Sequence, residues 1–397
     1  MNDVTIIGGG IVGLATGYSL INKNPNLKLA ILEKESVVGK HQTGHNSGVI
    51  HSGIYYKPGS LKAINCRYGI ELLLQFCEES NIKYDICGKV IVATKQSELE
   101  TLDLLYKRGQ KNGIKGLKKL CPGELREYET YATGLSALYC PEAGIVDYSQ
   151  VCLKLSEKIL DKAEILTSTT VTSIDQRKDG IILVSDNVEI QSKYLINCAG
   201  LFSDQIAKLS GMDVDSRIVP FRGEYYMLKD EARHLVKNLI YPVPDPRYPF
   251  LGVHFTRTID GAIEAGPNAV LAWAREGYHK TDFNLKEMWD YLSYKGFWSM
   301  AGKYWKTALG EYYRSFFKYA FVNALQKLVP DIKHSDIKSA PSGVRAQALS
   351  PNGKLLDDFV ISNNDNMTHV INSPSPAATS SLAIGEQITN IYLKNKA

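Results

Sequence analysis

The chain has 397 residues, of which 44% are hydrophobic and 22% charged, and its formal net charge is +4. This is the composition of an ordinary globular protein long enough for two domains, and the charge is too small and too evenly spread to indicate a nucleic-acid partner. Its seven scattered cysteines form neither a zinc motif nor a disulfide framework, so we predict no metal site and a reducing, cytoplasmic environment.

The first stretch of the chain has the pattern of a dinucleotide-binding turn. An apolar strand is predicted from Val4 to Ile7 and a helix from Ile11 to Ile21, and three glycines stand at the turn: Gly8, Gly10 and Gly13. Such a turn lets the backbone approach a pyrophosphate, whose charge the helix N-terminus stabilises. A second strand from Lys28 to Leu32 ends at Glu33, at the distance where a carboxylate accepts hydrogen bonds from an adenosine ribose.

A polar loop follows, and the chain then returns to the first sheet. The loop, residues 41–60, carries three histidines within eleven residues and has no helical period, which is typical of a loop that bears function. Helices are predicted at 61–81 and 97–112. A strand from Tyr194 to Cys198 ends in small residues, Ala199 and Gly200, that can pass close beneath a dinucleotide. We therefore expect this strand to lie in the first sheet.

The second half of the chain changes character. Residues 217–266 read as several strands separated by proline and glycine turns, which is typical of an antiparallel sheet and of a second domain. Residues 282–328 are predicted to be helical and are rich in aromatic and basic side chains. The last helix is predicted to begin with Ser375 as N-cap and Pro376 in the first helical position. The small residues that follow would let a flat ring approach the helix N-terminus.

These motifs together resemble the L-2-hydroxyglutarate oxidase/dehydrogenase family, part of the larger group of FAD enzymes shaped like D-amino acid oxidase. The glycine turn and the last segment alone would indicate only the larger group, whereas the histidine-rich loop and the segment IYPVPDP…GVH are much more specific. The resemblance covers nearly the whole chain and rests on Glu33 and on these segments: 8–13, 41–63, 221–226, 240–257, 260–270, 343–359 and 372–381.

The resemblance implies an α/β fold, α+β overall, with two domains. A Rossmann-like FAD-binding domain would be assembled from residues 1–84, 148–213 and 336–397, and a substrate domain with a mixed or antiparallel sheet from residues 85–147 and 214–335. The resemblance also implies FAD as cofactor and the oxidation of L-2-hydroxyglutarate to 2-oxoglutarate. The electrons would pass to oxygen or to a membrane quinone.

The residues that would hold FAD are also implied by the resemblance. The glycine turn and the end of the second strand would hold the ADP half: Gly8, Gly10, Ile11, Val12, Gly13, Glu33 and Lys34. Beside the flavin and the pyrophosphate would lie Thr43, Gly44, His45, Asn46 and Ser47; beside the adenine and ribose, Val171, Ala199 and Gly200. The pyrimidine edge of the flavin would meet Ser375, Pro376, Ala377, Ala378 and Thr379, with Arg345 just ahead of them in the chain.

Hydride transfer from C2 of a hydroxy acid to flavin N5 requires a base for the hydroxyl proton. Histidine suits this task because its unperturbed pKa lies near neutral pH. His51 is the first candidate and His254 the second. Each could equally be a structural histidine, and the sequence leaves this choice open.

A five-carbon dicarboxylate needs a cation for each carboxylate, preferably an arginine for its planar fork. Arg345 is the candidate for the carboxylate beside the reacting carbon. The distal carboxylate has three candidates, Arg222, Arg257 and Lys57, although surface arginines are common. Three tyrosines could donate to a carboxylate or serve packing alone: Tyr55, Tyr225 and Tyr241.

Two other functions remain open at this point. One is an oxidoreductase of the same fold that acts on another 2-hydroxy acid, an amino acid or glycerol phosphate. The other is a non-catalytic flavin- or NAD-binding module. It is disfavoured because such a module would not need the histidine-rich loop, the carboxylate clamp and the flavin-edge segment together. NAD is disfavoured because the dinucleotide domain is split across distant segments.

The helical segment 282–328 is where a partner could bind. Its aromatic rings, interleaved with lysines, could lie in a membrane interface and deliver electrons to quinone on the inner face of the cell membrane. The competing expectation, which we favour, is that most of these rings pack against the substrate-domain sheet. The strand pattern that starts at residue 4 leaves no room for a targeting peptide, and no apolar run is long enough to span a membrane.

Overall fold

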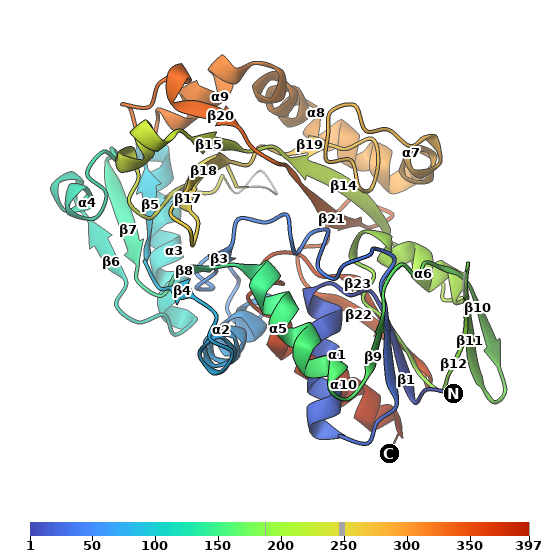
Figure 1. Cartoon of the computed structure of the whole chain (residues 1–397). Helices are drawn as coiled ribbons and strands as arrows, with labels where there is room; N and C mark the ends of the chain where they lie inside the picture. Colours follow the sequence, from blue (N-terminus) through green and yellow to red (C-terminus); the bar gives the residue numbers. More distant parts are fainter. Residues whose placement is uncertain (187, 246–250, 397) are drawn as a thin grey trace.

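A six-stranded sheet forms the centre of the lower part of the molecule in Figure 1. The computed structural model describes residues 1–186, 188–245 and 251–396. Across the sheet the strands are β22 (Val360–Asn363), β23 (Met367–Asn372), β13 (Leu195–Asn197), β1 (Val4–Ile7), β2 (Leu29–Leu32) and β9 (Glu164–Leu166). All neighbours are parallel except β22 with β23. Segments more than 300 residues apart in sequence therefore share one sheet.

Both faces of this sheet are covered, which is why its central strands are apolar throughout. One face and the helices beyond it share a single core, with helices α1 (Ile11–Lys23), α2 (Leu61–Glu79), α5 (Tyr148–Leu160) and α10 (Ser381–Lys396). The other face packs against helix α6 (Ser203–Leu209) and a small antiparallel sheet of β10 (Val171–Arg177), β11 (Gly180–Ser185) and β12 (Glu189–Ser192). This is the Rossmann-like layer arrangement that the sequence predicted.

An eight-stranded mixed sheet forms the other half. Its strands, in order, are β20 (Ile337–Ser339), β15 (Tyr226–Leu228), β18 (Ile263–Gly266), β17 (His254–Arg257), β16 (Leu239–Pro242), β5 (Lys89–Ala93), β7 (Ser136–Cys140) and β6 (Lys118–Leu120). Only β16 and β5 pair in parallel. Helices α3 (Leu99–Lys111), α4 (Pro122–Tyr128) and α9 (Lys318–Leu325) contribute to the cores on its faces. The predicted α/β fold with a mixed-sheet second domain is confirmed.

Two further three-stranded sheets join the halves. One contains β19 (Val270–Leu271), β14 (Arg217–Gly223) and β21 (Gly343–Leu349), and it packs against helices α7 (Leu285–Leu292) and α8 (Lys295–Phe316) at the top of Figure 1. The other contains β3 (Val49–Ile50), β8 (Gly144–Val146) and β4 (Tyr84–Asp85). Strand β20 pairs with β15 and strand β21 pairs with β14, and both partners lie within residues 214–335, assigned to the substrate domain. The predicted division placed residues from 336 onward in the FAD-binding domain.

The predicted start of the last helix is wrong. Helix α10 begins at Ser381, and the residues before it, from Ser375 on, form a turn. The backbone N–H of Ala377 donates to the carbonyl of Pro374, and that of Ser380 donates to the carbonyl of Pro376. Proline is common both in turns and in the first position of a helix, so Pro376 and its neighbours did not distinguish a turn from a helix start. The segment 240–257 is only partly described, since residues 246–250 lie outside the described ranges.

Candidate active site

A cavity of about 1370 Å³ lies where the two halves meet. Its walls come from the β1–α1 turn, the histidine-rich loop, strands β17 and β21, and the turn before α10. This volume exceeds that of a typical small-ligand pocket, which is about 300–1000 Å³, so it has room for a dinucleotide and a small substrate together. Most of the residues that the sequence assigned to FAD line it.

The glycine turn between β1 and α1 has no space for a side chain at Gly8 or at Gly13. Gly8 has a φ of +109°, and a Cβ there would lie 2.4 Å from the carbonyl oxygen of Cys198. A Cβ on Gly13 would lie 2.0 Å from the carbonyl oxygen of Gly8, so this glycine closes the turn itself. At Gly10, which lines the cavity, the nearest atom to such a Cβ is Thr43 Oγ1 at 3.6 Å. The bare turn at the N-terminus of α1 therefore fits the pyrophosphate of FAD.

Glu33 is held rigidly at the end of β2, only 8% exposed. Its Oε2 accepts a hydrogen bond from the Gly9 N–H at 2.8 Å, and its Oε1 accepts one from the Glu35 N–H at 2.9 Å. Each oxygen keeps a second lone pair. Glu33 lines the cavity together with Lys34 and the residues expected beside adenine and ribose: Val171, Ala199 and Gly200. The carboxylate of Glu33 thus offers acceptors for hydroxyl groups at this wall, and its assignment to the ribose stays a prediction.

The loop after Glu33 is fastened to the glycine turn. Thr43 Oγ1 accepts a hydrogen bond from the Ile11 N–H at 3.1 Å, and Asn46 Oδ1 accepts one from the Gly48 N–H at 2.8 Å. The His45 ring stacks on Tyr278 with centroids 4.4 Å apart. The cavity is lined by Ile11, Val12, Thr43, His45, Asn46 and Ser47, and by Ser375, Pro376, Ala377 and Ala378.

Three residues assigned to FAD do not line the cavity: Gly13, Gly44 and Thr379. A Cβ on Gly44 would lie 2.8 Å from the carbonyl oxygen of Gly39, so this glycine shapes the loop. Thr379 is buried, and its Oγ1 shares hydrogen bonds with the Tyr148 hydroxyl at 2.8 Å and the His51 N–H at 3.1 Å. These three residues hold the segments that line the cavity in place and do not line it themselves.

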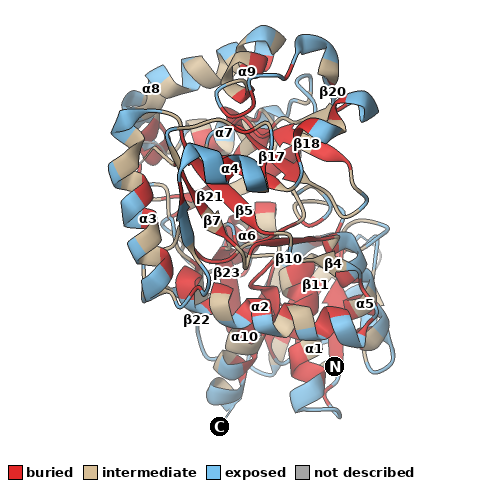
Figure 2. Cartoon of the chain, turned by 90° about the vertical axis from the view of Figure 1, so that its left-hand side faces the viewer, coloured by how far each residue is buried: buried red, intermediate tan, exposed pale blue. Residues whose placement is uncertain are grey.

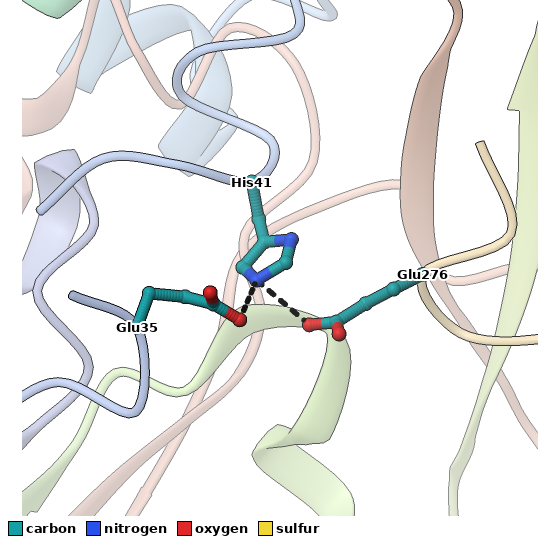
Figure 3. A group of neighbouring side chains, drawn as sticks. All are labelled: Glu35, His41 and Glu276. Atoms are coloured by element: carbon teal, nitrogen blue, oxygen red, sulfur yellow. Dashed lines mark hydrogen bonds and ion pairs between the residues drawn. The ribbon is translucent and has the colours of Figure 1, made fainter. Parts of the chain in front are cut away.

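An ionic cluster ties the two halves together at one end of the cavity. Figure 3 shows His41 between two carboxylates, with its Nε2 3.0 Å from Glu35 Oε1 and 2.9 Å from Glu276 Oε1. The three residues have the spacing of metal ligands. The Lys34 ammonium, however, already lies 2.6 Å from the same oxygen of each carboxylate. Hydrogen bonds from Lys34, and then Lys40, lower the pKa of Glu35 to about 2, so the cluster is an ion-pair network.

His254 is the histidine whose protonation state is best defined. It is 6% exposed, and its Nδ1 lies 2.8 Å from the Gly252 carbonyl oxygen. A carbonyl only accepts, so Nδ1 carries the proton and the other ring nitrogen, Nε2, is the acceptor. Burial, with the nearby charges of Arg345 and Lys89, lowers the pKa of His254 to about 3, which keeps the ring neutral. It lines the cavity beside Tyr241, with ring centroids 3.9 Å apart.

His51 lines the same cavity. Its Nε2 lies 3.3 Å from Ser375 Oγ, in the turn expected at the flavin edge. Its Nδ1 is buried and has no hydrogen-bond partner among the described residues. Burial, followed by the charge of Lys89, lowers the pKa of His51 to about 3. Both candidate bases therefore face one cavity in the neutral form.

The candidate cations divide into two groups. Arg345 and Lys57 line the cavity, and Arg345 hydrogen-bonds the Tyr225 side chain, whose pKa burial raises to about 12. Arg222 lies outside it, 3.1 Å from Glu224 and 2.9 Å from the His279 carbonyl oxygen. Arg257 also lies outside it and is paired with Asp85. Arg222 and Arg257 are therefore not among the residues that line this cavity.

Five cations that line the cavity were not predicted: Lys40, Lys62, Arg108, Lys303 and Lys354. Two of them lie on helices α2 and α3. Lys62, near the start of α2, is 8% exposed and lies 2.9 Å from Asp357. Arg108 of α3 donates to the Tyr55 carbonyl at 2.7 Å. The sequence held a partial signal for Arg108, because Thr101, Leu104 and Arg108 have the spacing of one helix face. The structure shows that all three residues line the cavity. The predicted Tyr55, Tyr225 and Tyr241 also line it.

The helical segment 282–328 exposes most of its aromatic rings. Figure 2 shows much of α8 in the colours of exposed and intermediate residues. Phe297 and Phe321 are buried, as expected, but eight rings are more than half exposed: Phe283, Trp289, Trp298, Trp305, Tyr313, Phe316, Phe317 and Tyr319. We call these eight the aromatic surface. The prediction that most rings pack against the sheet is therefore wrong. Within the described residues no helix is both long and apolar enough to cross a membrane.

Comparisons with known proteins agree with this site. The family model described as FAD dependent oxidoreductase matches residues 3–391. An L-2-hydroxyglutarate dehydrogenase of Indibacter alkaliphilus is 51% identical over 99% of both chains. The mitochondrial L-2-hydroxyglutarate dehydrogenase of Homo sapiens is 46% identical over 98% of this chain and 88% of its own length.

Solved structures match the fold. The L-alpha-glycerophosphate oxidase of Mycoplasma pneumoniae, with FAD bound, has a TM-score of 0.80 at 23% identity, covering 99% of this chain and 94% of its own. The glycine oxidase of Geobacillus kaustophilus has a TM-score of 0.75 at 17% identity, covering 99% and 95%. At these identities the likeness concerns the fold alone. The chain, by its near full-length matches, belongs to the FAD-dependent oxidoreductases and, within them, to the L-2-hydroxyglutarate dehydrogenase family.

Proposed function

We propose that this protein oxidises L-2-hydroxyglutarate to 2-oxoglutarate. The observation that carries the proposal is the 51% identity, over 99% of the chain, to a relative of that name. The cavity supports it, because the turn that fits FAD faces the same space as two neutral histidines and several cations. When bound, FAD supplies the acceptor for the hydride that leaves C2 of the substrate.

His254 is the base that the geometry favours for the substrate hydroxyl. Its Nδ1–H is fixed by the Gly252 carbonyl, which leaves Nε2 able to accept a proton. The low pKa of His254 keeps this nitrogen unprotonated, and a bound carboxylate would raise that pKa toward the working pH. His51, whose Nε2 already contacts Ser375, then orders the turn before α10.

Different cations of the cavity would bind the two carboxylates of the substrate. Arg345, oriented by its contact with Tyr225, would bind the carboxylate beside the reacting carbon through its planar fork. Among the other cations that line the cavity, Lys57 and Arg108 are the candidates for the distal carboxylate, whereas Lys62 already lies 2.9 Å from Asp357. Arg222 and Arg257 are not needed, because each is already paired with a carboxylate elsewhere.

Anaerobic bleaching of the bound flavin tests the proposal. L-2-hydroxyglutarate should reduce the flavin, whereas its D enantiomer should not. Bleaching by glycerol 3-phosphate or an amino acid, with none by L-2-hydroxyglutarate, would instead support another substrate of the same fold. Protein that is colourless and cannot be reconstituted with FAD would support a non-catalytic module.

The electron acceptor is proposed to be a quinone reached at the surface of the cell membrane, from the cytoplasmic side. Support comes from the aromatic surface, beside which Lys303 and Lys306 lie over Tyr304 and Trp305 at 5.0 and 5.5 Å. Exposed aromatic rings among lysines suit an interface with anionic lipids.

Co-sedimentation with anionic vesicles tests this contact. Replacing Trp289, Trp298 and Trp305 by serine should abolish binding. The same change at Leu153 and Leu160, exposed positions of α5, should leave it intact. Wild-type protein that stays in the supernatant, and that yields hydrogen peroxide instead of reduced quinone, would favour oxygen as acceptor.

A further inference from the structure

Lys89 is a buried cation without a counter-ion. It is the first residue of β5, between Leu239 of β16 and Cys140 of β7, and it is 1% exposed. Among the described residues its Nζ has no hydrogen-bond partner and no carboxylate within ion-pair distance. Buried charges are normally paired, because taking an unpaired one out of water is expensive.

Two cavity-lining tyrosines enclose this ammonium group. Nζ lies 4.6 Å from the centre of the Tyr55 ring and 4.7 Å from the centre of the Tyr241 ring. Lys89 points to the same face of the sheet as Ile91 and Tyr241, since these positions alternate with the residues of the opposite core. Its charge is thus separated from the cavity by no more than the two rings, which attract it only weakly.

Within the described residues, the other titratable groups that act on Lys89 carry no compensating charge at neutral pH. They are the hydroxyls of Tyr55 and Tyr241, the thiols of Cys66, Cys87 and Cys140, and the imidazoles of His51 and His254. Burial lowers the pKa of Lys89 to about 8, so the group is mostly charged at neutral pH and loses its charge above pH 8. Lys62 and Arg345 add further positive charge nearby.

We propose that Lys89 is a positioning residue whose charge, held behind Tyr55 and Tyr241, selects an anionic substrate. This inference rests on the proposed function. A carboxylate of the substrate would be the counter-charge that the protein itself does not provide. A residue kept at a cost to stability is expected where its charge serves a ligand.

The test compares Lys89→Met and Lys89→Arg with the FAD-loaded wild type. Lys119→Met, an exposed lysine of β6 in the same sheet, is the matched control. Glutarate, a dicarboxylate without the reacting hydroxyl, is titrated while the flavin spectrum is recorded from pH 6 to pH 10. Thermal unfolding is measured without glutarate.

Lys89→Met should unfold at a higher temperature than the wild type, because it removes an uncompensated buried charge, yet bind glutarate about tenfold more weakly. That is roughly the effect of one unit charge acting over about 10 Å at an effective dielectric constant of about 20. Wild-type affinity should fall above pH 8, whereas Lys89→Arg should hold its affinity there because arginine stays charged. Lys119→Met should match the wild type throughout.

A Lys89→Met variant that is less stable and binds glutarate with wild-type affinity and pH dependence would overturn the inference, since Lys89 would then serve the fold alone. Wild-type flavin that is not bleached by L-2-hydroxyglutarate overturns the proposed substrate instead. In that case the unfolding comparison, which uses no substrate, still tests whether Lys89 is an uncompensated charge.

Discussion

Adding a single methyl group at Gly10 or at Gly13 should separate cofactor binding from folding. Gly10 is the N-cap of α1 and Gly13 lies in its first turn, but only Gly10 lines the cavity. At Gly10 the backbone is extended (φ −76°, ψ 174°), a conformation open to alanine, and the nearest atom to a new Cβ is 3.6 Å away. The methyl group of Gly10→Ala therefore fits the protein and points into the space that the pyrophosphate needs.

The magnitude follows from these contacts. Overpacking by a methyl group costs about 1–3 kcal/mol, which corresponds to an FAD dissociation constant raised about 5- to 150-fold. The apoprotein should change in stability by about 1 kcal/mol or less, because Gly10 is an N-cap without a side-chain hydrogen bond. At Gly13 the new Cβ would lie 2.0 Å from a backbone oxygen, so Gly13→Ala should destabilise the apoprotein itself.

The assay is fluorimetric titration of apoprotein with FAD, together with urea unfolding of each apoprotein. Gly310→Ala is a suitable control, since a Cβ there meets no atom within 4 Å and the position is helical. Wild-type FAD affinity in Gly10→Ala would refute the assignment of this turn to the pyrophosphate. Equal loss of apoprotein stability in both variants would refute the distinction between the two glycines.

Other perturbations test the remaining parts of the site. His254→Gln should slow anaerobic flavin reduction about 10²- to 10⁴-fold without loss of bound FAD, and His51→Gln should slow it less; the reverse order would make His51 the base. The folded-state pKa values of His51 and His254 lie at about 3, below the unfolded value of about 6.5. The unfolded state therefore binds more protons between these values, and stability should be lost as the pH falls from about 6.5 to 3. Urea unfolding in acid should show a shallower loss in His254→Gln, and an unchanged slope would contradict the depressed pKa. Arg275 is 1% exposed and lies 2.6 Å from both Asp204 and Asp290, so Arg275→Met should cost about 3–5 kcal/mol of unfolding free energy at pH 7, partly recovered by Asp204→Asn.

Strand alternation explains why some predicted cations miss the site. Phe221 lies opposite Arg345 in the β14–β21 pair, so these two side chains share a face and Arg222 points to the other. On β17, His254 and Arg257 are three residues apart and also point to opposite faces. The opposite orientation of His254 and Arg257 could be predicted from the sequence once the bounds of β17 were known. The pairing of β14 with β21 could not, because the two strands lie more than 100 residues apart.

The sequence by itself determined the cofactor turn and the family. The cofactor turn consists of a strand, three glycines, a helix and an acidic residue within about thirty consecutive positions, so local spacing is enough to specify it. Only the tertiary structure decided which charges face the substrate, since that depends on strand partners and on carboxylates far away in sequence. Lys89 illustrates the limit. In the sequence it is one lysine at the edge of an apolar strand, and only burial between Tyr55 and Tyr241 makes it an uncompensated charge.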